Sequence, residues 1–504
     1  MKHCNIGSMG FKSCVLGLVV LILTSFLSVP PVSAQQAASS QRQVFLSLEE
    51  AIGLALQNNL EISIEQYNPE IQREEITNAE AAFDHTLSSA GSQTFAESTT
   101  STSQAESTTG IQFGLNKRFT TGGTYGLELQ TSRSGFDDAT EIDDVYATSV
   151  DLTVGQALLK NRGIQVNTTP ILIARKSRDI SLSELRTTVI DIVSQVKNTY
   201  WNLVFQRGDL EAKRLSLELA YDLVKINEAQ VEVGTLAPIE VLQAQATAAS
   251  REVDIISAEL SVQNTEDELK RLLNFPDDDP VWTASIIPTD APVAERQPIS
   301  LDESIQLALD NREELKQIQK SLEIRNLSLN LAENQLLPSL DLQGQVGLTG
   351  QDENWGGAFS ETPNFDDYDL TVSLSFSYPL GNNAAESAFN QAKLEFDQTR
   401  LSIQNLEQVI TVQVRQAVRA VETALKTVEA TKVARQLAEE QLGAEEKKFR
   451  EGLSTNFQVL DYQDKLATAQ SRETQAMTGY NQALVGLDQA TGLTLQRHNI
   501  VVNE

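Results

Sequence analysis

Phe449-Arg450-Glu451-Gly452-Leu453-Ser454-Thr455-Asn456-Phe457-Gln458-Val459-Leu460-Asp461 is the stretch that decides the fold, because one long helical pattern ends in it and another begins. Glycine tolerates the left-handed backbone that terminates helices, so Gly452 predicts the end of the first helix. An earlier stretch repeats the arrangement, with Gly234 and Pro238 between two helical patterns. The sequence therefore predicts two antiparallel helical hairpins.

The segments on either side of the two turns have helical periodicity. We expect long helices over 170–233 and 384–450, with return helices over 239–273 and 457–491. Apolar residues recur at three-four spacing, the pattern of a coiled-coil seam. These residues are Leu182, Leu185, Val189, Ile192, Val196 and Leu203, then Val414, Val418, Val421, Leu425 and Val428. A helix of about sixty residues reaches roughly 90 Å, far longer than a globular domain needs.

The two halves of the chain open in the same way. Ser47 precedes Glu50 by three residues, and Ser300 precedes Glu303 by three residues, each pair standing before an apolar helical run. This spacing predicts a helix cap in both places and indicates an internal two-fold repeat. The predicted repeats are 35–273 and 299–492, joined by a proline-rich linker at 274–298 and followed by a tail at 493–504.

Strand patterns lie between the opening helix and the long helix of each half, over about 84–158 and 339–380. Alternation of apolar and polar residues, as in 150–154 and 370–376, is typical of strands in a membrane barrel. From Leu46 to Gly234 the separation is 188 residues, whereas from Ile299 to Gly452 it is 153. Nearly all the extra length falls in the first strand region, which predicts four strands there and two in the second.

Two acidic segments, 134–144 and 351–369, are predicted to be solvated loops between strands. They lack the ligand spacing of a calcium-binding loop, so we do not assign them to cation binding.

The N-terminus has the features of a secretory signal peptide over 1–34. Lys2 and Lys12 precede an apolar run, and the small residues of 32–34 suit cleavage before Gln35. Both cysteines, Cys4 and Cys14, fall in this segment, so we expect no thiol chemistry in the mature chain. No later apolar run reaches the length of a membrane-spanning helix, so membrane crossing would require a closed β-barrel.

Composition excludes several classes of function. The net charge of −30 argues against a nucleic-acid partner. His85 and His498 are isolated, and the chain has no nucleophile elbow, phosphate loop or metal-ligand spacing, so we expect neither an enzyme nor a cofactor. The remaining alternative to a channel is a secreted or periplasmic coiled-coil scaffold or adhesin, which needs no lipid-facing strands.

Together these features resemble the TolC-like outer-membrane efflux protein family. The resemblance rests on both hairpins, with Phe449-Arg450-Glu451-Gly452 followed by Val459-Leu460-Asp461, and Val233-Gly234 followed by Glu240-Val241-Leu242-Gln243-Ala244-Gln245. It implies an α+β membrane protein, a homotrimer whose strands close one barrel in outer-membrane lipid and whose long antiparallel coiled-coil helices form a periplasmic tunnel. The family usually contributes four strands per chain, so six strands leave twelve-stranded and eighteen-stranded barrels both open.

The resemblance also implies a function and its partners. Members act as the exit duct of a tripartite efflux or type I secretion system, together with a periplasmic adaptor (membrane fusion) protein and an inner-membrane transporter. The two helical turns would lie at the periplasmic tip, where Gly234 and Gly452 make the bends. The adaptor would contact these glycines and the apolar residues Val241, Leu242, Val459 and Leu460.

In the family, carboxylates just after the second turn surround the aperture of the tunnel. The matching positions here are Gln458 and Asp461, so a three-fold ring of Asp461 would favour cations. The plain alternative is that Asp461 is a solvated helix residue. Glu240 holds the acidic position of the first hairpin. The basic residue expected after the second glycine is replaced by Ser454, and Arg450 could substitute for it.

Overall fold

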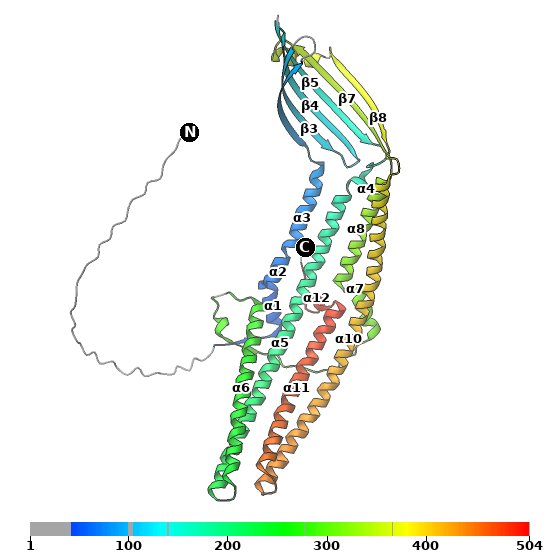
Figure 1. Cartoon of the computed structure of the whole chain (residues 1–504). Helices are drawn as coiled ribbons and strands as arrows, with labels where there is room; N and C mark the ends of the chain where they lie inside the picture. The colour runs from blue at the N-terminus through cyan, green and yellow to red at the C-terminus, as the bar shows by residue number, and fades with distance from the viewer. Residues whose placement is uncertain (1–41, 99–103, 139–140, 277, 365, 503–504) are drawn as a thin grey trace, which may run out of the picture. The chain divides into compact units, whose positions relative to one another are not determined.

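The computed structural model describes residues 42–98, 104–138, 141–276, 278–364 and 366–502 (Figure 1). The predicted signal peptide, with Cys4 and Cys14, lies outside the described residues. From Arg42 onward the chain forms one compact unit. None of the helices in the described ranges has the length and hydropathy that a bilayer crossing requires.

Four long helices form two antiparallel hairpins (Figure 1). They are α5 (Thr169–Glu232), α6 (Pro238–Leu273), α10 (Asn383–Arg450) and α11 (Asn456–Thr491). Every boundary falls within one residue of its prediction. With 64 and 68 residues, α5 and α10 are each roughly 95–100 Å long. Because α11 packs against α5 as well as α10, the two hairpins lie side by side.

Shorter helices run along the upper parts of these hairpins. They are α1 (Leu48–Asn58), α2 (Leu60–Glu65), α3 (Tyr67–Glu80), α7 (Leu301–Asn311) and α8 (Glu313–Gln335), with the short α4 (Ile164–Asn167) and α12 (Thr494–Arg497) and a 3-10 turn, η1 (Ala81–Phe83). The predicted cap of α1 is present, since Ser47 and Glu50 exchange hydrogen bonds as a capping box. At α7, Ser300 Oγ accepts a hydrogen bond from the Glu303 amide (3.4 Å).

The segment 274–298 is partly ordered into secondary structure. It holds a 3-10 turn, η2 (Pro280–Thr283), and the strand β6 (Ser285–Pro288), which pairs in parallel with β1 (Gln43–Leu46). Tyr200 of α5 donates from its hydroxyl to the Leu46 carbonyl (3.0 Å). These contacts fasten the segment to the helices.

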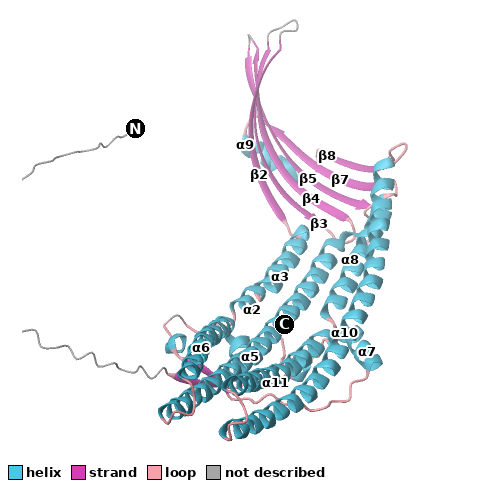
Figure 2. Cartoon of the chain, turned by 60° about the horizontal axis from the view of Figure 1, so that its bottom comes forward, coloured by secondary structure: helices cyan, strands magenta, loops and turns pink. Residues whose placement is uncertain are grey.

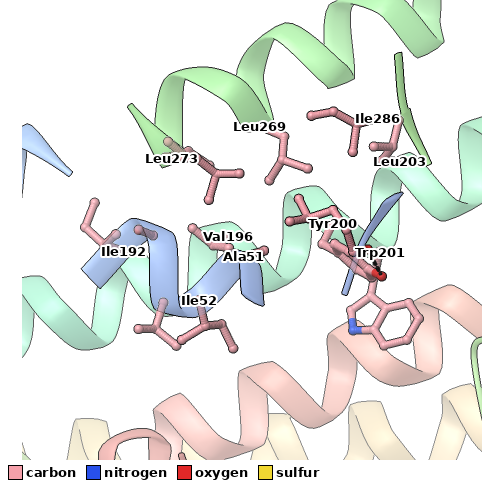
Figure 3. Close-up of a cluster of buried hydrophobic side chains, with 14 of the residues drawn as sticks. Ala51, Ile52, Ile192, Val196, Tyr200, Trp201, Leu203, Leu269, Leu273 and Ile286 are labelled. Atoms are coloured by element: carbon pink, nitrogen blue, oxygen red, sulfur yellow. Dashed lines mark hydrogen bonds between the residues drawn. The ribbon is translucent and has the colours of Figure 1, made fainter. Parts of the chain in front are cut away.

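The predicted coiled-coil seams form the cores. From α5, Leu185, Ile192 and Val196 pack with α1, α6 and β6 in one cluster, which Figure 3 shows in part. From α10, Val414 and Val421 pack with α7 and α11 in a second cluster. The three-four spacing therefore identified the buried face of both long helices.

One antiparallel sheet contains six strands in the order β2-β3-β4-β5-β7-β8 (Figure 2). They are β2 (Thr86–Ser98), β3 (Gln104–Arg118), β4 (Gly123–Asp138), β5 (Glu141–Ala157), β7 (Ser339–Asp352) and β8 (Tyr368–Ser377). Four strands come from the first half and two from the second, the division expected from the length difference. The sheet is open, with β2 and β8 at its edges.

The prediction of two loops was wrong. Segment 134–144 belongs mostly to β4 and β5, which continue to Asp138 and resume at Glu141, because strand pairing needs backbone bonds and not apolar side chains. Segment 351–369 contains the helix α9 (Trp355–Glu361) and a 3-10 turn, η3 (Thr362–Asn364). Glycine and proline in this segment suggested a loop, but contacts with distant strands hold it as a helix.

Candidate functional site

The two helical turns have the same backbone geometry. Gly234 and Gly452 have φ angles of +76° and +73°. Past each glycine an amide donates back to the preceding helix, Thr235 N to Gln230 O (2.9 Å) and Leu453 N to Lys448 O (2.8 Å). A Cβ built on either glycine would meet no atom within 4 Å. The glycines are therefore required for the left-handed backbone and not for close packing.

Ser454 occupies the position where the resemblance predicts a basic residue. Its hydroxyl contacts the carboxylate of Glu445 on α10 and lies 2.9 Å from Gln458 Oε1 on α11. Lys448 Nζ is 3.0 Å from the same Glu445 carboxylate. The hydrogen bond from Ser454, followed by the contacts with Lys448, lowers the pKa of Glu445. The second turn is thus closed by a hydroxyl–carboxylate contact, which the sequence reasoning missed.

Gln458 and Arg450 both have local roles. Gln458 forms a capping box with Thr455 at the start of α11. Arg450 turns back onto its own helix, where Nε donates to the Glu446 carbonyl (3.3 Å). In the described part of the chain Arg450 forms no ion pair with Glu240.

Asp461 is half-exposed on α11 and pairs with Lys465 one helical turn later, with 2.6 Å between Oδ2 and Nζ. Lys465 also lies 4.7 Å from the centre of the Tyr462 ring. The hydrogen bond with Asp461 raises the pKa of Lys465. The Asp461 carboxylate is therefore accessible to solvent, and the Lys465 ammonium group lies beside it. The i, i+4 spacing of these residues could have revealed the pair from sequence.

Arg251 joins the two hairpins close to their turns, and sequence reasoning did not find it. Its guanidinium is buried and donates to the Ser216 carbonyl on α5 (2.6 Å), and to Gln463 Oε1 (3.2 Å) and the Leu460 carbonyl (3.3 Å) on α11. Gln463 in turn donates to the Leu219 carbonyl (3.3 Å). Three helices thus share one buried cation.

Nearer the turns, the backbone carbonyl of Glu240 accepts from Asn456 Nδ2 of the second hairpin (3.2 Å) and from Asn227 Nδ2 (3.5 Å). The side chain of Glu240 is half-exposed. The first and second turns are therefore held together by a polar contact at their tips as well as by Arg251.

The four apolar residues expected to meet a partner protein have different exposures. Val459 and Leu460 are buried, where they pack with Leu223, Leu442 and Phe449. Val241 is half-buried and Leu242 is 61% exposed. Other apolar side chains at the turns are more exposed and were not singled out from sequence. They are Val233, Ile239, Leu453 and Phe457.

The sheet has one apolar and one polar face. Across four strands, Leu127, Leu152, Val346 and Leu370 are partners in register, so their side chains share a face. On edge strand β8 this face is widely exposed, with Leu370, Val372, Leu374 and Phe376 between 62% and 70% exposed. The other face of the same strands carries Gly126, Thr153, Gln345 and Thr371. A contiguous exposed apolar face of this extent marks a surface that lipid or protein covers.

The two described histidines, His85 and His498, lie in separate surroundings. His85 stacks edge-on against Tyr125 (6.1 Å), while His498 Nε2 lies 3.1 Å from Lys197 Nζ. Burial and the neighbouring cations Lys197 and Arg497 lower the pKa of His498. Within the residues that the structure covers, no group of three histidine, cysteine, aspartate or glutamate side chains could hold a metal ion.

Comparisons with known proteins agree on one family. A sequence model described as outer membrane efflux protein matches residues 124–274 and 304–493. The pyoverdine export outer membrane protein OpmQ of Pseudomonas putida is 24% identical over 329 residues, which are 63% of this chain and 65% of the relative. The chain thus spans slightly less than two thirds of that relative's length.

Solved structures share the fold at low sequence identity. The Campylobacter jejuni CmeC outer membrane channel is 16% identical with a TM-score of 0.65, covering 89% of this chain and 86% of CmeC. The outer membrane protein VceC of Vibrio cholerae is 16% identical with a TM-score of 0.67, covering 88% of this chain and 96% of VceC. Long helical hairpins joined to an antiparallel sheet are therefore an architecture found in outer-membrane channels.

Proposed function

Since the chain belongs to the outer membrane efflux protein family, we propose that it is the outer-membrane exit duct of a tripartite efflux or type I secretion system. It would take substrates from a periplasmic adaptor and an inner-membrane pump and conduct them to the exterior. The observation that carries this proposal is the exposed apolar face of a sheet that continues directly into two helical hairpins roughly 100 Å long. A scaffold or adhesin that is surrounded by water would not expose such a large apolar face.

In this proposal three chains close one barrel. Backbone groups at a sheet edge cannot remain unpaired in lipid, and one chain leaves both β2 and β8 open. Because the six strands alternate in direction, β8 of one chain can pair antiparallel with β2 of the next. Ile111 and Phe113 of β3 and Leu87 of β2 continue the apolar face. Their position favours an eighteen-stranded barrel over a twelve-stranded one with β2 and β3 outside.

The two halves, 35–273 and 299–492, act as two repeats in the same proposal, with 274–298 as their connection. Each would supply one helical hairpin to the periplasmic tunnel and its strands to the barrel. The matched glycine turns and the serine caps of α1 and α7 support the duplication.

We place the two turns at the periplasmic tip, with Asp461 lining the aperture beside Gln458 and Glu240. The half-exposed carboxylate of Asp461 supports this role, while the positive charge of Lys465 reduces the net negative charge at this position. The adaptor would meet the exposed apolar side chains Leu242, Leu453 and Phe457, because Val459 and Leu460 are occupied by packing within the chain.

Fractionation of cells that express the full chain tests the proposal. We expect a trimer in the outer-membrane fraction that resists detergent until heated. Leu374→Arg places a cation on the apolar face of β8 and should abolish this trimer, since arginine in the middle of a barrel's lipid face costs about 2–4 kcal/mol. The adjacent Ser373→Arg, on the polar face, is the matched control and should be tolerated. Recovery of the wild type from the soluble periplasm would support the scaffold instead.

A further inference from the structure

The helix α9 packs against β5 and β7 near the end of the sheet that lies away from the long helices (Figure 2). A Cβ on Gly350 would lie 2.2 Å from the Ala358 carbonyl, and a Cβ on Gly357 would lie 2.1 Å from Asp352 Cγ. Gly350 and Asp352 lie on the same face of β7 as the apolar side chains, so α9 covers that face. Because residues 350 and 357 are both glycines, the helix can approach the strand closely.

Contacts on the inner side of α9 fix its position. Ala358 and Thr362 are buried, and the Thr362 hydroxyl lies 3.4 Å from the Thr148 carbonyl of β5. The Trp355 ring stacks edge-on against Tyr146 with 4.9 Å between centroids. Asn354 caps the helix by accepting from the Gly357 amide (2.9 Å). The helix is therefore a built part of the sheet's outer surface.

The other side of α9 is apolar and uncovered. Phe359 is 64% exposed and Trp355 is 39% exposed. Within α9 the only charged residue is Glu361, at its end. Tyr146 covers one edge of the Trp355 ring, and the exposed part of this ring and most of Phe359 face either lipid or water.

The height of α9 along the strands identifies its surroundings. The apolar band begins at Tyr368 in β8 and ends at Tyr378, the residue after the strand, which is about 33 Å at 3.3 Å per residue. With a tilt of about 40° this corresponds to about 25 Å across the membrane, the usual height of an apolar barrel band. Leu348 pairs with Tyr368, and α9 packs against residues two and four positions past Leu348. The helix thus lies about 7–13 Å along the strand beyond that end of the band.

We propose that α9 is an interfacial collar that lies in the boundary between the outer leaflet and water, with Trp355 and Phe359 in contact with lipid. Tryptophan is enriched at this depth, where its apolar body and its polar N–H are both satisfied, and the wholly apolar Phe359 ring is removed from water there. The occupant of the uncovered side of α9 is therefore the bilayer itself and not a protein. The collar would fix the height of the barrel in the membrane. This inference rests on the proposed insertion of the sheet.

Fluorescence of Trp355 tests the proposal in the full-length mature trimer. The chain has three tryptophans, so W201F with W282F leaves Trp355 alone. The protein is reconstituted in phosphatidylcholine vesicles brominated either near the headgroup or near the middle of the acyl chains. We expect loss of Trp355 fluorescence with shallow bromine, a smaller loss with deep bromine, and weak quenching by iodide in the water. Should W201F disturb the core, the difference between wild type and W355F reports the same ring.

A control in the middle of the apolar band separates the two proposals. Val372→Trp in a background without the natural tryptophans should be quenched most by deep bromine. If Val372→Trp is quenched and Trp355 is quenched only by iodide, the collar is refuted while the barrel stands. If neither position is quenched by either lipid, the sheet is not inserted and both proposals fail.

Discussion

At the scale of single residues, the candidate aperture depends on one carboxylate and its neighbour. Asp461 is proposed for the aperture because of its place after the second turn, and the net charge there also depends on Lys465, whose Nζ lies 2.6 Å from Asp461 Oδ2. An exposed pair of this kind contributes less than about 1 kcal/mol to stability. Its removal should therefore change the electrostatics of the tip without unfolding it.

We predict opposite effects for the two partners on ion selectivity. Asp461→Asn should reduce the preference of the channel for cations and its block by multivalent cations, because it would remove three negative charges from the aperture of the proposed trimer. Lys465→Gln should increase both, because it leaves the carboxylates uncompensated. Reversal potentials of single channels at low salt, where screening is weak, measure the effect. Unchanged selectivity in both variants would remove Asp461 from the aperture.

The contact between Ser454 and Glu445 leads to a prediction about how the stability of the second turn depends on pH. Because the pKa of Glu445 is lowered in the folded chain, its contacts stabilise the turn above the ordinary pKa of 4.5 and are lost as pH falls through the lowered value. Ser454→Ala removes the largest cause of the shift, so the loss should occur at higher pH. A spin label at Leu453→Cys reports the mobility of the turn. Equal midpoints in Ser454→Ala and the unsubstituted turn would contradict the assignment.

At the scale of elements, the sequence predicted what local pattern controls. Gly452 and Pro238 delimit the long helices, and three-four spacing identified their buried faces, because both signals are contained within one element. The helix α9 could not be predicted in this way. Gly356 and Gly357 are poor helix formers, and the segment is helical because Ala358 and Thr362 pack on strands far away in sequence. Tertiary contact outweighs local propensity there.

Arg251 is a further residue that local pattern does not reveal. It lies in an alanine- and serine-rich stretch of α6, and this local pattern predicts that an arginine side chain is exposed to solvent. Only the packing of α6 against α5 and α11 turns it into a buried donor to Ser216, Leu460 and Gln463.

We predict that Arg251→Ala loosens the second hairpin from the first. Hydrogen bonds from a charged group are worth about 1.5–3 kcal/mol each, and Arg251 makes two of them to α11, so opening between α6 and α11 should become easier by about 3–6 kcal/mol. Hydrogen exchange of amides in the lower halves of both helices should increase. Arg271→Ala, on the same helix but exposed and paired only with nearby acids, is the matched control and should leave exchange at the tip unchanged. Slow exchange at the tip in Arg251→Ala would show that Arg251 is not needed to hold the two hairpins together.

At the scale of the whole molecule, the proposed membrane insertion of the open sheet calls for further copies of the chain. The exposed apolar face crosses all six strands, yet both edge strands lack a neighbour in the described chain. A barrel made from three such sheets satisfies the edges, whereas a single chain in lipid cannot. The number of strands is therefore a property of the assembly, and it is decided by which strand meets β8.

Cysteine cross-linking distinguishes the two barrels. The only cysteines, Cys4 and Cys14, precede the predicted cleavage site, so introduced thiols in the mature chain report without background. Leu374→Cys on β8 is combined with one cysteine on β2, at Ser89, Gly91 or Gln93, which share the apolar face.

Directly opposed side chains on paired strands lie about 4.5–5.5 Å apart at Cβ, so oxidation should yield a covalent trimer for at least one pair. Ala90→Cys with Leu374→Cys is the matched control, because Ala90 points to the polar face and should not react. In a twelve-stranded barrel β8 would instead meet β4 of the next chain, and Leu374→Cys would cross-link to a cysteine at Tyr125, Leu127 or Leu129, which share the apolar face, and to no position on β2. The strand that cross-links to β8 therefore gives the number of strands in the barrel. A cross-link to β2 means that each chain contributes six strands, and a cross-link to β4 means that each chain contributes four.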